Sequence, residues 1–124
     1  AADLNAFAVT PTYNLAQLYL RFGTVGKALP IFQGLQKRSP KDVEVGSALA
    51  SANLIKGDYQ SAVDIYARFD KATLANPSVG LNYAVALKLL NRPQDAQTVL
   101  SNVSGSTTGA IAEYAQRVDK FVRN

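Results

Sequence analysis

Apolar residues recur three and four positions apart along most of the chain, in stretches that Gly, Pro and Asn separate. In the first stretch Leu15, Leu18 and Phe22 keep this spacing, which is typical of one face of a helix. Residues 23–26 include two glycines and break the pattern, and a second apolar stripe begins at Ala28. The pattern predicts two helices joined by a tight turn.

Two further helical pairs follow. Pro40 closes the first pair, because the residue before a proline is biased away from helical backbone. In the second pair the turn is Gly57-Asp58, and the second apolar stripe runs from Tyr59 to Phe69. In the third pair Asn91-Arg92-Pro93 forms the turn. Every apolar stretch has the helical period, so the sequence predicts an all-α fold in a single domain.

The C-terminal stretch predicts one more helix. Residues 104–109 are small and polar and read as a loop, and an apolar stripe then runs from Ile111 to Val122. A single amphipathic helix after helical pairs is expected to cover the apolar face of the last pair. A helix lying on a membrane surface is the rival interpretation, which Glu113 and Asp119 disfavour.

Similar residues return at intervals of 34 positions. Four columns keep this spacing: Gly23, Gly57 and Asn91; Ala28, Ala62 and Ala96; Phe32, Tyr66 and Leu100; and Ala16, Ala50 and Ala84. Alanine where two helices cross lets their backbones approach to ordinary packing distance. Phe32, Tyr66 and Leu100 are expected to fill the space between neighbouring pairs as core residues.

These columns carry a resemblance to the tetratricopeptide repeat family. The run from Tyr13 to Tyr19 resembles the first helix of that repeat, and the run from Gly57 to Val63 resembles its turn and second helix. Pro40 stands in the place of the terminal proline of the repeat. The resemblance implies an α-solenoid, a right-handed superhelix of three repeats with a C-terminal capping helix. The implied ranges are 9–42, 43–76 and 77–110 for the repeats and about 108–123 for the cap.

The chain departs from the pattern of that family in three respects. The large aromatic residue usual early in the first helix is replaced by Thr12, Gly46 and Gly80. Leu74 stands where the second repeat would have its terminal proline, and Pro93 is unusual in the third turn.

The resemblance also implies a concave groove for a protein or peptide partner, lined by the first helix of each repeat. The implied groove residues are Tyr13, Gln17, Leu20, Arg21, Ser51, Leu54, Ile55, Leu81, Val85, Lys88 and Leu89. Of these, Leu54, Leu81, Val85 and Leu89 predict an exposed apolar patch, which on a monomer usually marks a partner site. The alternative is that they meet the final helix or a second copy of the chain.

The first-repeat groove positions also bear on the kind of partner. The carboxylate clamp of the resembled family uses Lys and Asn where this chain has Tyr13 and Gln17. We therefore expect an apolar or amphipathic segment as the partner, rather than the C-terminus of a chaperone. Tyr13, Arg21 and Lys88 would supply an aromatic anchor and two cations.

Composition argues against several kinds of chemistry. The 124 residues contain no Cys and no His, so the chain has no thiol nucleophile, imidazole base or ordinary zinc site. The acids read as caps, turns and solvated helix positions, and no phosphate-binding Gly-rich loop is present. We expect no enzymatic activity, cofactor or metal. No apolar run approaches the ~20 residues of a membrane span.

The net charge of +4 is spread along the chain, and its densest group, Lys37, Arg38 and Lys41, has no interleaved aromatic residues. Nucleic acid is therefore not an expected partner. The start at Ala1 suggests a processed or excised product. Analogy with the family suggests three roles: an adapter or scaffold in bacterial pilus assembly or secretion, a chaperone for secreted proteins, or a fragment of a longer array that serves spacing or self-assembly. The bacterial periplasm or envelope is slightly favoured over the cytoplasm.

Overall fold

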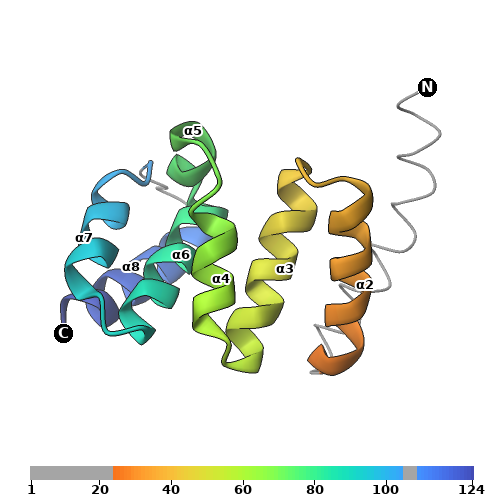
Figure 1. The fold of residues 1–124 in the computed structure, drawn as a ribbon. Helices are drawn as coiled ribbons and strands as arrows, with labels where there is room; N and C mark the ends of the chain where they lie inside the picture. Colours follow the sequence, from red (N-terminus) through yellow and green to blue (C-terminus); the bar gives the residue numbers. More distant parts are fainter. Residues whose placement is uncertain (1–23, 105–108) are drawn as a thin grey trace. The chain divides into compact units, whose positions relative to one another are not determined.

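The computed structural model describes residues 24–104 and 109–124, and all regular structure in these ranges is helical (Figure 1). The all-α fold class is therefore confirmed for the described residues. None of the helices in these ranges is long and apolar enough to cross a membrane. The chain divides into two compact units, the first ending at Asp58 and the second covering Tyr59–Asn124.

In the first unit, α2 (Val25–Arg38) packs against α3 (Val43–Lys56). Both ends of α3 have a local cause. The Asp42 carboxylate accepts hydrogen bonds from the backbone amides of Glu44 and Val45, which caps the N-terminus. Gly57 ends the helix with a φ of 97°, a left-handed conformation that glycine adopts without steric cost. The predicted Gly57-Asp58 turn thus has the expected chemistry.

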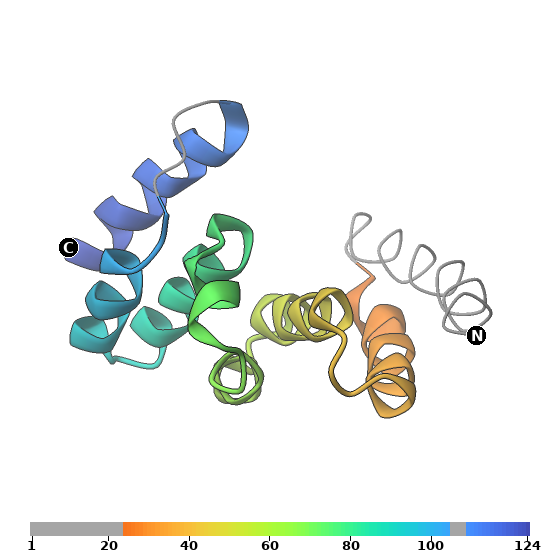
Figure 2. The ribbon, with the colours of Figure 1, turned by 90° about the horizontal axis from the view of Figure 1, so that it is seen from above.

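The second unit contains α4 (Tyr59–Tyr66), α5 (Lys71–Ala75), α6 (Pro77–Leu89), α7 (Pro93–Ser101) and α8 (Gly109–Arg123). Helix α6 is central, because α4, α5, α7 and α8 all pack against it, and α8 also contacts α7 (Figure 2). The residues of α6 that are buried lie on several sides of the helix, as its neighbours require: Val79, Gly80, Leu81, Ala84, Ala86 and Leu87.

The helices begin at the predicted interval. The starts of α2, α4 and α7 at Val25, Tyr59 and Pro93 are 34 residues apart, and so are those of α3 and α6 at Val43 and Pro77. The residues of the predicted small columns that lie in described helices are fully buried: Ala28, Ala62 and Ala96, and Ala50 and Ala84. Phe32 and Tyr66 are likewise fully buried, whereas Leu100 is half-buried. The members Ala16 and Gly23 lie outside the described residues.

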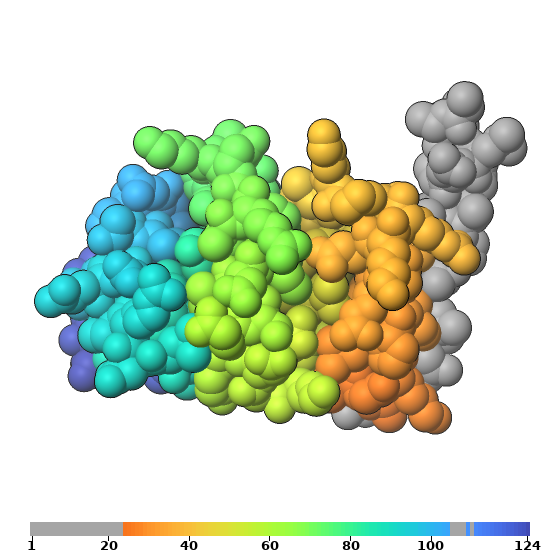
Figure 3. Space-filling model, viewed as in Figure 1, coloured from red at the N-terminus to blue at the C-terminus, as the bar shows by residue number. Residues whose placement is uncertain are grey.

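One predicted helix is shorter than expected. The stripe from Tyr59 to Phe69 predicts a single helix, but α4 ends at Tyr66 and the short helix α5 follows after a turn. Asp70 explains the new start, because its carboxylate accepts a 2.8 Å hydrogen bond from the Thr73 amide. Phe69 remains in the core region, where its ring contacts that of Tyr66 edge to face. In the space-filling view, α5 and the end of α7 both reach the upper edge of the second unit (Figure 3).

Candidate functional site

The predicted groove residues fall into three groups by location. Tyr13, Gln17, Leu20 and Arg21 lie outside the described residues. Ser51, Leu54 and Ile55 lie on α3 in the first unit. The remaining four, Leu81, Val85, Lys88 and Leu89, lie on α6 in the second unit.

On α3 the exposure of these residues rises toward the C-terminal end of the helix. Ser51 and Leu54 are half-buried, and Ile55 is 60% exposed. Lys56 follows at the last position of the helix and is exposed. The last turn of α3 therefore presents a large aliphatic side chain beside an ammonium group.

On α6 the predicted exposed patch needs correction. Leu81 is only 2% exposed and belongs to the core, and Val85 is half-buried. The reason is the number of helices around α6, because α4, α5 and α8 pack against it as well as α7, its partner in the predicted third pair. The sequence held the signal, because apolar residues lie all around this helix, a pattern typical of a buried helix. Leu89, at the end of the helix, is 40% exposed.

The last helix covers one side of α6. Tyr114 of α8 donates a hydrogen bond through its hydroxyl to Oδ1 of Asn82. Val85 and Leu89 follow Asn82 by three and seven positions and so share its side of α6. Val118 and Val122 of α8 are buried. The half-burial of Val85 fits the alternative stated above, in which groove residues of the third pair meet the final helix.

Ile55 and Leu89 occupy equivalent positions, because 34 residues separate them and each lies in the last turn of the first helix of its predicted pair. Each has a lysine next to it, Lys56 after Ile55 and Lys88 before Leu89. In the described part of the chain, four large apolar side chains are exposed: Ile55, Leu89, Val43 and Phe121. Ile55 is the most exposed of the four.

Several of the acidic residues that the structure describes have local structural partners. Asp42 and Asp70 cap helices, Asp64 accepts a hydrogen bond from Gln60, and Asp95 pairs with Arg92 at 2.9 Å. The hydrogen bonds from Thr73 hold the pKa of Asp70 below its usual value. Within the described ranges no three Asp or Glu residues gather where a metal ion could bind.

Two tyrosines of the second unit are shifted toward their neutral form. Burial raises the pKa of Tyr83, which lies near Arg92 and Asp95, and burial also raises the pKa of Tyr114. The ring of Tyr83 lies 5.4 Å from that of Tyr66, centroid to centroid. At neutral pH both half-buried phenols keep their protons, and Tyr114 acts as a hydrogen-bond donor.

Sequence reasoning missed a cleft between α5 and α7, because it predicted no break after Tyr66. No family model matches this chain, and comparison with curated proteins gives no significant match.

Proposed function

We propose that this chain is a protein–protein interaction module of the tetratricopeptide type, an adapter or scaffold and not an enzyme. The observation that carries the proposal is the exposure of Ile55 and Leu89 at equivalent positions 34 residues apart. A single exposed aliphatic residue is ordinary on a protein surface. Here an exposed aliphatic residue occurs at the same position of two successive helical pairs, while the alanine columns of both pairs are buried. This recurrence favours a binding role for the exposed position.

The neighbouring lysines indicate the chemistry of the partner. Lys56 and Lys88 place one cation beside each exposed aliphatic side chain. A partner segment that fits both features carries large apolar residues for the contact and acidic residues for the lysines. Each last turn can make this contact within its own unit.

Selection of peptides against the intact chain tests this proposal. A displayed library of random linear peptides is enriched on the full-length protein, and the best binder is synthesised and titrated by fluorescence anisotropy. We expect enriched peptides to combine aliphatic or aromatic residues with Asp or Glu. The double variant Ile55→Asp/Leu89→Asp should weaken binding about ten-fold or more, and each single variant should remove the contact of its own unit, because a charge replaces a desolvated contact.

Val43→Asp is the matched control. Val43 is 39% exposed at the start of α3, the helix that carries Ile55 at its other end. An acid in the first turn suits the helix dipole, so this variant should fold and bind as the parent does. The proposal fails if selected peptides bind equally well to the Ile55 and Leu89 variants, or if Val43→Asp weakens binding as much as they do.

A further inference from the structure

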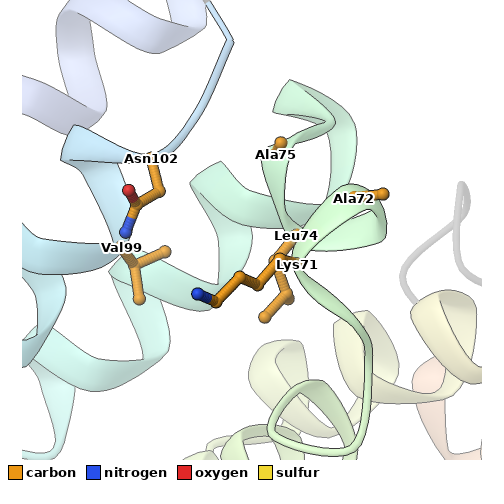
Figure 4. A pocket seen from close by; sticks show the side chains of 6 residues that line it. All are labelled: Lys71, Ala72, Leu74, Ala75, Val99 and Asn102. Carbon is orange, nitrogen blue, oxygen red and sulfur yellow. The ribbon is translucent and has the colours of Figure 1, made fainter.

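A cleft of about 370 Å³ opens between α5 and the C-terminal end of α7 in the second unit (Figure 4). Its lining residues come from only these two helices and the residue after α7: Lys71, Ala72, Leu74, Ala75, Val99 and Asn102. None of them belongs to the predicted groove or to the last turns of α3 and α6. The cleft is thus a separate feature of the fold.

The break after α4 accounts for the cleft. By the 34-residue period, Lys71 corresponds to Lys37, which lies in the last turn of the continuous helix α2. In the second unit the helix stops at Tyr66 and restarts at Lys71 under the Asp70 cap, so the equivalent residues form a separate short helix. Residues that would have continued α4 instead form one wall of a cleft, and α7 forms the other.

Two contacts hold the walls together at one end. The Ser104 amide, beyond the end of α7, donates a 2.8 Å hydrogen bond to the carbonyl oxygen of Ala75, the last residue of α5. Gly80 of α6 lies so close to Leu74 and Val103 that a side chain there would collide with both. One backbone hydrogen bond thus links the two segments beside the cleft, and both pack closely on Gly80 of α6, which favours a preformed site.

The lining combines an apolar floor with one cation. Leu74, Ala75 and Val99 supply aliphatic surface. The side-chain amide of Asn102 donates a 3.1 Å hydrogen bond to the carbonyl oxygen of Thr98. The Lys71 side chain extends from α5 toward Val99 (Figure 4). No acidic residue lines the cleft, and Lys71 forms no ion pair with the residues that the structure describes.

We propose that this cleft binds a small aliphatic carboxylate, with its hydrocarbon part on Leu74 and Val99 and its carboxylate on the Lys71 ammonium. The volume lies at the lower end of the range usual for small-molecule sites, so it suits a short branched chain. Lys71 is exposed where it lines the cleft, and its ammonium can give the carboxylate a charge-assisted hydrogen bond, which is roughly twice as strong as a neutral one. This inference is independent of the proposed partner contact at Ile55 and Leu89.

The test is a titration of the full chain, labelled with nitrogen-15, with isocaproate, followed by amide chemical shifts in two-dimensional NMR spectra. The largest shifts should fall on residues 71–75 and 99–102. Isocaproamide has nearly the same shape and no charge, and it should bind about ten-fold more weakly, which reports the charge-assisted bond.

Three variants make the test specific. Lys71→Gln should weaken isocaproate binding about ten-fold while leaving isocaproamide unchanged, and Lys71→Arg should restore most of the affinity for the acid. Lys41→Gln removes the same charge from an exposed position in the first unit and should change nothing. Val99→Phe narrows the cleft and should abolish binding of both compounds, with the dispersion of the spectrum showing that the fold is kept.

Several outcomes would overturn the proposal. It is wrong if the acid and the amide bind equally, if the shifts spread over other helices, or if Lys41→Gln lowers affinity as much as Lys71→Gln. Absence of any saturable shift in the parent protein would also refute it.

Discussion

The hydroxyl of Tyr114 donates a hydrogen bond to Oδ1 of Asn82, and this bond joins the last helix of the chain to the central helix of the second unit. Tyr114→Phe removes the bond and leaves the ring in place. We expect a loss of about 1 kcal/mol in the free energy of unfolding, the usual net value of a partly buried hydrogen bond. Urea unfolding of Tyr114→Phe, Asn82→Ala and the double variant measures it. Purely additive losses in this cycle would show that the two residues are not coupled.

Stability should fall in alkali because burial raises the pKa of Tyr83 and of Tyr114 above the usual value of 10.0. The folded chain then keeps these protons when the unfolded chain releases them. Their stabilising effect is complete below about pH 10 and is lost as the pH rises through the folded pKa values. Absorbance of tyrosinate measured alongside unfolding should show a smaller alkaline loss for Tyr114→Phe than for the parent protein. An unchanged pH profile would contradict this assignment.

Gly80 cannot carry a side chain without a shift of its neighbours. A Cβ at this position would collide with the carbonyl oxygen of Leu74 and lie 2.6 Å from Cγ2 of Val103. Gly80→Ala should therefore destabilise the second unit by about 1–3 kcal/mol, the usual cost of overpacking. Gly34→Ala is the control, because Gly34 of α2 has open space around it and alanine favours a helix by about 0.5–1 kcal/mol. Equal effects in thermal unfolding would disprove the close approach.

The short helix α5 should depend on pH through its cap. The Thr73 amide donates to the Asp70 carboxylate, and this interaction lowers the pKa of Asp70 below 3.8. The cap is fully formed above the unfolded pKa and is lost as the pH falls through the lower, folded value. Carboxyl shifts of Asp70 and hydrogen exchange of the Thr73 amide should follow the same titration. Asp70→Asn should flatten the exchange profile, since an amide side chain caps without titrating.

Turn and cap residues made most helix ends predictable from the sequence. Gly57 ends α3 in a left-handed conformation that few residue types adopt, and Pro77 begins α6, where its fixed φ suits a helix and its missing amide hydrogen costs nothing. The break between Tyr66 and Lys71 was not predicted, because the apolar spacing continues to Phe69 while the Asp70 cap restarts the helix. The apolar spacing indicates which residues face a core, but it does not indicate whether the backbone stays helical between them. The cleft beside α5 exists because the backbone leaves the helix after Tyr66.

The candidate site shows the same limit. The family resemblance placed Leu81 and Leu89 on the partner-facing side of the third pair, yet Leu81 is 2% exposed and Leu89 is 40% exposed. The position of a residue within one helical pair cannot reveal how many other helices surround that pair. Here α4, α5, α7 and α8 all contact α6.

The two leucines should therefore respond differently to truncation. Leu81→Ala should lower the free energy of unfolding by about 2–5 kcal/mol, because it removes buried methyl groups and leaves a cavity. Leu89→Ala should cost less than about 1 kcal/mol, since much of its side chain already contacts water. Both substitutions remove the same atoms from the same helix, so each serves as the control of the other in urea unfolding. Similar losses would mean that the helices packed against α6 do not cover Leu81 in solution, and the partner surface of α6 would then extend from Leu89 back to Leu81.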